Sequence, residues 1–261
     1  MRFDGKTAIV TGGSRGIGRG IVERLGGEGA EVLIDGRDER ALDQAVDEMR
    51  AAGLDVTALA GDVTQEGHIE ALAAHAMKIW GRIDILVNNA AFSDPGPVLE
   101  LSRAQWDRVL AVALTAPFLL SQAVARHMVG AGSGVILNIT SIACHGATNS
   151  VNYSAAKTAL LSVTRDFATE LGPMGVRCVA VSPGWIDTPM MAEHNPPELV
   201  ERLRSDFARV PLRRLVNVDE VVALCAFAAS DEASAITGCE LLVDGGMRAD
   251  LHVLPTLGGG Q

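Results

Sequence analysis

Three side chains in the middle of the sequence could carry out proton chemistry together: Ser141, Tyr153 and Lys157. Tyr153 and Lys157 are four residues apart, so on a helix they share a face. An ammonium group beside a phenol stabilises the phenolate and lowers the pKa of a tyrosine from its usual value of about 10. Such a tyrosine can exchange a proton with an alcohol or a carbonyl, while Ser141 could hold the substrate oxygen.

The same spacing of tyrosine and lysine is common on helix surfaces, where it serves packing alone. Two features favour chemistry. Tyr153 is the only tyrosine of the chain, and it follows a small, polar loop that comes after the apolar run at residues 135–139. The carboxyl ends of parallel strands are where such sheets bind ligands. We therefore interpret the three residues as a candidate catalytic set.

A glycine-rich turn lies between the first predicted strand and the first predicted helix. It reads Thr-Gly-Gly-Ser-Arg-Gly-Ile-Gly over residues 11–18. Glycine lets the backbone approach a ligand, and amides at a helix N-terminus bind phosphate groups. Glycine also serves loops that only need positive φ angles, but a turn that follows a strand and opens a helix within a βαβ unit is the arrangement of a dinucleotide site. We expect this turn to bind a pyrophosphate.

The end of the second predicted strand bears on which dinucleotide binds. There, an acidic side chain binds the ribose 2′-hydroxyl of NAD, whereas an arginine accommodates the 2′-phosphate of NADP. Asp35 and Arg37 share one strand face, so the sequence leaves open which of them reaches the ribose. Arg15 adds a second cation, and two guanidiniums suit a phosphate dianion. We favour NADP(H), with NAD(H) possible and two solvated surface arginines as the structural alternative.

The elements that must position these residues are short apolar runs alternating with longer amphipathic segments. Nearly continuous apolar runs, such as residues 83–87, are typical of parallel strands that helices cover on both faces. The sequence thus predicts an α/β fold, a Rossmann-like doubly wound sheet of seven parallel strands flanked by helices. The predicted strands are residues 7–10, 31–34, 56–60, 83–87, 135–139, 176–181 and 240–243, and the first predicted helix is residues 18–27.

No repeat, low-complexity tract or linker divides the chain, so we expect residues 1–261 to form a single dinucleotide-binding and catalytic domain. Residues 182–214 are rich in proline and methionine and too long for an idle connection, which predicts a lid. Its Met190, Met191 and Phe207 either contact an apolar substrate or pack against the domain. Residues 248–261 form a tail.

The composition narrows the possible partners. The 261 residues include 32 acidic and 22 basic ones, a net charge of −10 that disfavours nucleic acid and anionic lipid. The longest apolar stretch, residues 109–120, is shorter than the roughly 20 residues of a membrane span. The start of the chain is too charged for a signal peptide, and the 4 cysteines show no metal or disulfide spacing. We therefore expect a cytoplasmic protein without a metal.

Taken together, the ordered motifs resemble those of the short-chain dehydrogenase/reductase family, from about residue 6 to 246. Ser141, Tyr153 and Lys157 match the family's catalytic serine, tyrosine and lysine. The other matches are residues 11–18 with T-G-x-x-x-G-x-G, Asp62-Val63 with the pair that holds adenine, residues 88–91 with N-N-A-G (Ala91 replacing the glycine), residues 183–188 with P-G-x-x-x-T near the nicotinamide, and Thr237-Gly238 with residues 244–246 at the C-terminal signature.

The resemblance implies an enzyme, an NAD(P)-dependent oxidoreductase. It would transfer hydride between NADP(H) and a ketone or secondary alcohol, in the ketoreductase direction, for example on a 3-oxoacyl or polyketide-type ketone. Many NADP-using members carry a basic residue at the position of Arg37, and Lys157 would also bind the ribose. The implied cofactor-binding residues are Gly12, Ser14, Arg15, Gly16, Ile17, Gly18, Arg37, Asp62, Val63, Asn89, Ala90, Tyr153, Lys157, Gly184, Ile186 and Thr188.

Two other functions stay open at this point. One is an NAD-dependent alcohol or cyclic diol dehydrogenase, and the other, of a different class, is a non-catalytic NADP(H)-binding sensor or scaffold. Most family members form homotetramers through the helices that correspond to residues 102–128 and 153–171. The resemblance therefore implies a homo-oligomer, a tetramer, that acts on a small-molecule ketone or alcohol.

One departure from the family concerns Ala113, which stands where relatives carry an asparagine that completes a proton relay. Its absence is expected to straighten the helix and slow proton exchange, unless Asn152 or another nearby group substitutes. Among the histidines, we expect His68 and His75 to be solvated on a polar helix, and His145 either to contact a polar substrate or to face water.

Overall fold

A single parallel sheet organises the chain. The computed structural model describes residues 1–146, 149–188, 191–192 and 195–249. Seven strands pair in the order β3-β2-β1-β4-β5-β6-β7, every pair parallel, which confirms the predicted doubly wound fold. Strand limits differ from the predicted ones by at most two residues. The strands are β1 (Thr7–Val10), β2 (Glu31–Gly36), β3 (Val56–Ala60), β4 (Ile85–Asn88), β5 (Gly134–Ile139), β6 (Val176–Pro183) and β7 (Glu240–Val243).

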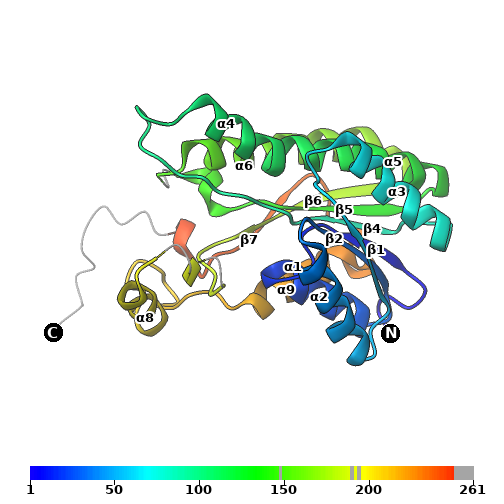
Figure 1. Cartoon of the computed structure of the whole chain (residues 1–261), viewed down its shortest axis with the longest axis horizontal. Coiled ribbons are helices and arrows are strands. Elements are labelled where there is room, and N and C mark those ends of the chain that lie inside the picture. Colours follow the sequence, from blue (N-terminus) through cyan, green and yellow to red (C-terminus); the bar gives the residue numbers. More distant parts are fainter. Residues whose placement is uncertain (147–148, 189–190, 193–194, 250–261) are drawn as a thin grey trace.

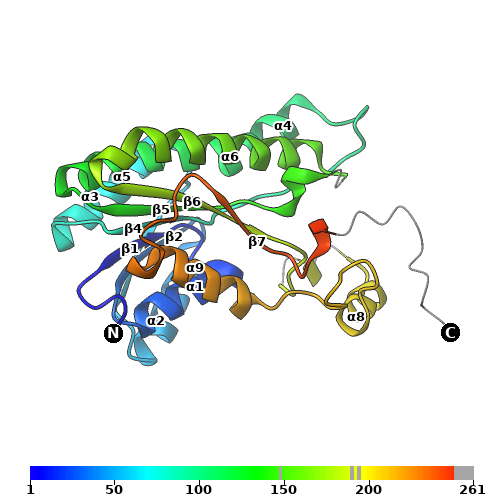
Figure 2. The same cartoon turned by 180° about the vertical axis from the view of Figure 1, so that it is seen from behind.

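Helices cover both faces of the sheet, as Figures 1 and 2 show from opposite sides. One face carries α3 (Glu66–Trp80), α4 (Arg103–Leu110), α5 (Ala116–Ala131) and α6 (Val151–Leu171). The other face carries α1 (Gly16–Gly27), α2 (Glu39–Ala51) and α9 (Val218–Ala229). The helix α8 (Pro197–Ser205) lies apart from both layers of helices and, in space, close to the helical turn at Met247–Ala249.

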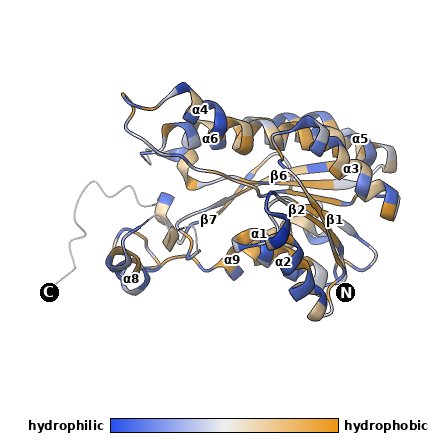
Figure 3. Cartoon of the chain, viewed as in Figure 1, coloured by the Kyte–Doolittle hydropathy of each residue, from blue (hydrophilic) through white to orange (hydrophobic). Residues whose placement is uncertain are grey.

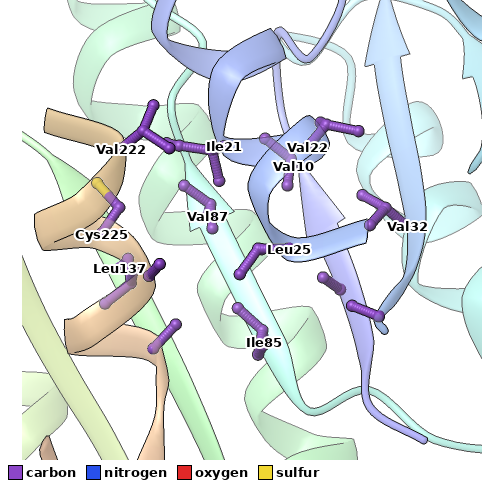
Figure 4. Packing of buried hydrophobic residues seen from close by; sticks show 14 of the residues in the cluster. Val10, Ile21, Val22, Leu25, Val32, Ile85, Val87, Leu137, Val222 and Cys225 are labelled. Carbon is purple, nitrogen blue, oxygen red and sulfur yellow. The ribbon is translucent and has the colours of Figure 1, made fainter. Parts of the chain in front are cut away.

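The two faces of the sheet have separate hydrophobic cores, because side chains alternate along a strand. In β1, Ala8 and Val10 pack with α1, α2 and α9, whereas Ile9 packs with α3 and α5. In β2, Leu33 joins Ile9 on the second face. Figure 4 shows the first core, where α1 and α9 press on the sheet, and Figure 3 shows the apolar sides of these helices turned inward. This packing fixes the strand ends that carry the site.

A third, smaller cluster lies outside the sheet, in the predicted lid. Its members pack with one another rather than with either face of the sheet. We call it the lid cluster: Met191, Val200, Leu203, Phe207, Val210 and Leu215.

Between α4 and α5 the helix widens into a π-helical segment, η1 (Ala111–Thr115), where the Ala116 amide bonds back to the Ala111 carbonyl. The expectation that Ala113 straightens this helix is therefore wrong. The physical reason is Pro117, which has no amide hydrogen to donate to the Ala113 carbonyl and whose ring crowds it in a regular helix. The proline supports the distortion, so no asparagine side chain is needed.

The run from Arg103 to Ala131 is also long and apolar enough to cross a membrane by length and composition alone. Half of its most apolar window is buried inside the molecule. A core helix of this kind passes the same test, so the feature carries little weight as evidence for a membrane.

Candidate active site

The candidate site lies where the carboxyl ends of β1, β4, β5 and β6 meet (Figure 1). The strand order changes direction between β1 and β4, and open α/β sheets bind ligands in the crevice at such a point. The segments after these strands carry the glycine-rich turn, residues 88–91, Ser141 and residues 183–188. The first two turns of α6 add Tyr153 and Lys157.

Ser141, Tyr153 and Lys157 come together between β5 and α6. The Ser141 hydroxyl hydrogen-bonds with the Tyr153 phenol. The Lys157 Nζ atom lies 5.6 Å from the centre of the Tyr153 ring. The same atom donates a hydrogen bond of 2.6 Å to the carbonyl of Ile139, the last residue of β5. One strand and one helix therefore assemble the whole candidate set.

Burial controls the protonation of Tyr153 and Lys157. It raises the pKa of Tyr153 to about 12, and the hydrogen bond from Ser141 acts in the opposite direction. It lowers the pKa of Lys157 to about 8. The expectation that the Tyr153 pKa lies below its usual value is therefore wrong for this arrangement, because desolvation of the phenol is the largest cause of the shift and only the Ser141 hydrogen bond opposes it. At neutral pH the phenol keeps its proton and most Lys157 side chains are charged.

The start of α6 is held by Asn152, which is fully buried. Its Nδ2 donates to the backbone carbonyls of Asp94 at 3.0 Å and Gln105 at 3.5 Å. Its Oδ1 accepts from the Tyr153 amide at 2.9 Å and from the Ser150 hydroxyl at 3.2 Å. These bonds occupy the whole side-chain amide, so Asn152 positions Tyr153 and does not take over the role of the missing asparagine.

The glycine-rich turn forms a cradle open to a ligand. Gly12 has φ +65°, and a Cβ there would lie 3.2 Å from Asn89 Nδ2. Gly16 has φ +57° with no atom within 4 Å of a Cβ position, while a Cβ on Gly18 would lie 2.3 Å from the Gly12 carbonyl oxygen. The residue before α1, Arg15, makes no side-chain cap. The first amides of α1 therefore remain available to an anion, and the backbone fits a pyrophosphate.

The turn is tied to the loop after β4. The Thr11 hydroxyl accepts from the amides of Asn89 and Ala90, each at 3.0 Å. In return, Asn89 Nδ2 donates to the Thr11 carbonyl at 2.9 Å. The predicted motifs after β1 and β4 thus form one rigid floor.

At the end of β2, Asp35 and Arg37 have different surroundings. Asp35 is 1% exposed, and its Oδ1 accepts from the Gly12 amide at 2.8 Å. Arg37 is exposed, as is Arg15. The charge of Arg37 is one of the causes that lower the pKa of Asp62, after the hydrogen bonds from Thr64 and with burial opposing them. The carboxylate of Asp35 is thus committed to the turn, and the guanidinium of Arg37 faces solvent.

The segment after β6 packs closely against the end of β7. A Cβ on Gly184 would lie 2.7 Å from the Asp244 Cα, so only glycine fits there. Ile186 is buried and forms a β-bridge with Val216. Thr188 is half-buried at the end of this segment. Residues 184–188 are therefore held beside the strand ends.

Two lid residues pack within the lid itself. Met191 is 9% and Phe207 is 8% exposed, both within the lid cluster. Trp185 meets the Phe207 ring edge-on, with 5.9 Å between ring centres. The packing alternative therefore applies to Met191 and Phe207, while Met190 lies outside the described residues.

Two histidines differ from their expected environments. The His68 side chain is only 9% exposed and lies 3.5 Å from the Asp35 carboxylate, so the expectation of a solvated His68 is wrong. His145 bonds to the Glu240 carboxylate at 2.7 Å, and Glu240 also accepts from Ser182 at 2.5 Å. His145 thus joins a polar chain beside β6 instead of facing water alone.

The remaining residues predicted to bind the cofactor lie along the same crevice. The half-buried ones are Ser14, Ile17, Asp62, Val63, Asn89 and Ala90, and the buried ones are Gly18, Lys157 and Ile186.

In the part of the chain that the structure describes, no group of three His, Cys, Asp or Glu side chains could hold a metal ion.

Sequence reasoning missed three residues that shape the site: Asn152 as an anchor of α6, Pro117 as the cause of the π-helix, and His68 under the turn. A proline in the middle of a predicted helix was the available signal for the second. The first and third depend on contacts between distant segments, for which the sequence offers no local pattern.

Comparison with known proteins agrees with this geometry. A family model described as Enoyl-(Acyl carrier protein) reductase matches residues 12–248. The chain is 39% identical, over 95% of its length and 98% of the relative, to cis-4-hydroxycyclohexanecarboxylate dehydrogenase of Sinomonas cyclohexanicum.

Two solved structures share the fold, each at 34% identity. A variant of actinorhodin polyketide ketoreductase, with NADPH, has a TM-score of 0.89 over 94% of this chain and 98% of that one. A 7α-hydroxysteroid dehydrogenase complexed with NADH and 7-oxo glycochenodeoxycholic acid has a TM-score of 0.88 over 94% of this chain and 95% of that one. The chain therefore belongs to the short-chain dehydrogenase/reductase family, whose members are oxidoreductases acting on alcohol and ketone groups.

Proposed function

We propose that the protein is an NADP(H)-dependent ketoreductase, a single-domain enzyme that reduces a small-molecule ketone to a secondary alcohol. The observation that carries this proposal is the grouping of the Tyr153 phenol with Lys157, whose Nζ lies 5.6 Å from the centre of the ring, and with Ser141 after the carboxyl end of β5. The phenol, whose pKa is raised by burial, is protonated at neutral pH and can give a proton to a carbonyl oxygen. Reduction needs a proton donor, whereas oxidation needs a base.

Each residue of the candidate set has its own role in the proposed reaction. Bound NADP(H) supplies the hydride, or accepts it in the reverse direction. The Ser141 hydroxyl orients the substrate oxygen, and Tyr153 protonates it as the carbonyl becomes an alcohol. The charged Lys157 stabilises the phenolate that remains after the transfer. The floor formed by Thr11, Asn89 and the turn would hold the cofactor.

The preference for NADP(H) rests on charge. Arg15 and Arg37 are both exposed beside the turn, and guanidiniums bind a phosphate dianion well. Asp35 accepts from the Gly12 amide and is 1% exposed, so it does not offer a carboxylate to the ribose 2′-hydroxyl. The actinorhodin polyketide ketoreductase structure contains NADPH, which is consistent with this proposal for a similar protein.

A second candidate is an NAD-dependent dehydrogenase of a cyclic alcohol. It is favoured by the names of two similar proteins, cis-4-hydroxycyclohexanecarboxylate dehydrogenase and a 7α-hydroxysteroid dehydrogenase with NADH. In this case the working direction is oxidation, and the affinity for NADH exceeds that for NADPH.

One experiment separates these functions. NADPH and NADH are titrated by fluorescence, and then cyclic ketones and 3-oxoacyl thioesters are added to wild type and to Tyr153→Phe. The proposal expects tighter NADPH binding and turnover that falls about 10²–10⁴-fold in the variant, since the proton donor is lost. Tighter NADH binding supports the second candidate. Tight cofactor binding with no substrate turned over by wild type supports a sensor or scaffold.

We further propose that the enzyme is a cytoplasmic homotetramer. Phe118 of α5 is 38% exposed and meets Phe167 of α6 edge-on, with 6.0 Å between ring centres. Such aromatic side chains on the outer face of two long helices suit burial against a second copy. Sedimentation of wild type and Phe118→Glu tests this, and a monomeric wild type would contradict it.

A further inference from the structure

The segment that carries Ser141 is held on both sides by one carboxylate at the edge of the sheet. We call residues 140–145 the Ser141 turn. Glu240 is the first residue of β7, the edge strand beside β6. It bonds to His145 across 95 positions of the chain, so the contact joins two distant segments. The reaction assigned to the candidate catalytic set makes no use of this carboxylate.

Glu240 holds the downstream end of the Ser141 turn directly. The Nε2 atom of His145 lies 2.7 and 2.8 Å from the two oxygens of this carboxylate, and the side chains are 21% and 16% exposed. A carboxylate only accepts hydrogen bonds, so Nε2 carries the hydrogen of this bond whether the imidazole is neutral or charged. Arg248 approaches the same carboxylate only to 3.5 Å. The imidazole is therefore the closer partner, and the contact requires no particular charge on it.

Glu240 holds the upstream end of the Ser141 turn through Ser182. The Ser182 hydroxyl donates to Glu240 Oε1 at 2.5 Å. The Thr140 hydroxyl shares its hydrogen between Ser182 Oγ at 2.5 Å and the Val181 carbonyl at 3.0 Å. Thr140 and Ser182 are 2% and 0% exposed, and a buried hydroxyl that loses its partner is costly. The residue directly before Ser141 is therefore linked to the same carboxylate as His145.

Ser141 lies between these two anchored ends. Its Oγ atom accepts from the Ala143 amide at 3.2 Å, and its carbonyl accepts from the Cys144 amide at 3.0 Å. The same hydroxyl hydrogen-bonds with the Tyr153 phenol. A further contact of the turn, from the Thr158 hydroxyl of α6 to the Cys144 carbonyl, is long at 3.4 Å. A shift of the turn therefore moves the Ser141 hydroxyl relative to the phenol.

We propose that Glu240 is a positioning residue for the reaction: by holding both ends of the Ser141 turn, it fixes the Ser141 hydroxyl beside the Tyr153 phenol. This inference rests on the proposed function, in which Ser141 orients the substrate oxygen. Glu240 acts through Ser141, so its removal leaves every reacting group in the protein and changes only their alignment. A misplacement of about 1 Å between reacting groups costs up to about 100-fold in rate.

The first test measures kcat and KM for reduction of cyclohexanone and of an acetoacetyl thioester by NADPH, per NADPH-binding site. Glu240→Ala is expected to lower kcat about 10–100-fold, with KM changed less than about threefold and the Kd of NADPH unchanged. Glu240→Gln can still accept from Ser182 and bond to His145, so it is expected to restore most of kcat. A merely structural role lowers the amount of NADPH-binding protein but leaves kcat per site unchanged, and that result overturns the inference.

A double-mutant cycle shows whether Glu240 acts through Ser141. In a Ser141→Ala background, Glu240→Ala is expected to lower kcat by less than about twofold, because the hydroxyl that it positions is already gone. A fall as large as in the wild-type background means that the carboxylate acts on another group, which overturns the inference. A wild-type kcat in Ser141→Ala contradicts the role of Ser141 in the proposed function, and with it the catalytic part of this inference.

A separate readout needs no substrate. Hydrogen exchange of the Ala143 and Cys144 amides, which both bond to Ser141, is measured by NMR in wild type and in Glu240→Ala. Exchange is expected to be at least about fivefold faster in the variant. Glu232→Ala, which removes a carboxylate that is 60% exposed, is the matched control and keeps the wild-type rates. Unchanged exchange in Glu240→Ala overturns the inference even where neither ketone is reduced, whereas faster exchange shows that the carboxylate holds the turn whatever the substrate.

Discussion

Replacing Lys157 with methionine is expected to make the protein more stable while it abolishes catalysis. Lys157 is 1% exposed, and burial lowers its pKa from 10.5 to about 8. A tenfold change in proton affinity is worth about 1.4 kcal/mol, so the charged lysine costs the folded state about 3 kcal/mol at pH 7. Methionine fills a similar volume without a charge.

The loss of a hydrogen bond offsets part of this gain in the free energy of unfolding. The bond from Nζ to the Ile139 carbonyl disappears, which costs about 1 kcal/mol. The net expectation for Lys157→Met is a gain of about 2 kcal/mol at pH 7. For a chain of this size that raises the melting temperature by about 4–8 °C.

The stability advantage of Lys157→Met is expected to depend on pH. Below pH 8 residue 157 of wild type carries its proton in both the folded and the unfolded chain, so the cost of the buried charge is fully present. As the pH rises from about 8 to 10.5, the folded chain loses the proton first, wild type becomes more stable, and the advantage of the variant shrinks. Below that range the advantage stays constant.

Urea unfolding at matched protein concentration, at pH 7 and at pH 10, measures both effects. Lys78→Met, which changes an exposed lysine of α3, is the control and should leave stability nearly unchanged. A variant at position 157 that is no more stable than wild type at pH 7, or whose advantage does not shrink at high pH, refutes the reasoning.

Three further predictions follow from the site. The rate of ketone reduction is expected to be constant from pH 6 to 7 and to fall above about pH 8. In that range Lys157 loses its proton, whereas Tyr153, with a pKa of about 12, keeps its proton. Single-turnover rates measured against pH check this. Gly18→Ala places a Cβ 2.3 Å from the Gly12 carbonyl oxygen and should weaken cofactor binding at least about tenfold, whereas Gly27→Ala in the same helix has open space and should not; cofactor titration distinguishes them. Ala113→Asn adds a polar side chain at a fully buried position and should lower stability by about 1–3 kcal/mol in urea unfolding, with a changed pH profile of turnover if a proton relay passes through residue 113.

The sheet could be predicted from the sequence because each strand carries its own signal. Residues such as Ile9 and Leu86 are buried on one face and their neighbours on the other, which leaves nearly continuous apolar runs. The glycine-rich turn was recognisable because its glycines stand at positions where a Cβ has no room or φ is positive. Local sequence determines these features.

The parts that the sequence did not predict depend on long-range contacts. The polar pattern of α3 predicts a solvated His68, but the lack of a side chain at Gly61 opens a space for the imidazole beside Asp35. In the same way, the two-residue spacing of Asp35 and Arg37 predicts a shared strand face, yet the Gly12 amide turns the carboxylate inward. Neither contact follows from the pattern of any single segment.

The lid cluster has an implication for how such enzymes diversify. Because Met191, Val200, Leu203 and Phe207 pack on one another, the segment carries its own source of stability. Because this cluster is separate from the two cores that cover the sheet, substitutions at the exposed positions of residues 195–214 are expected to leave the folding of the sheet unchanged. A directed library confined to those positions therefore varies this segment with little risk to the rest of the fold.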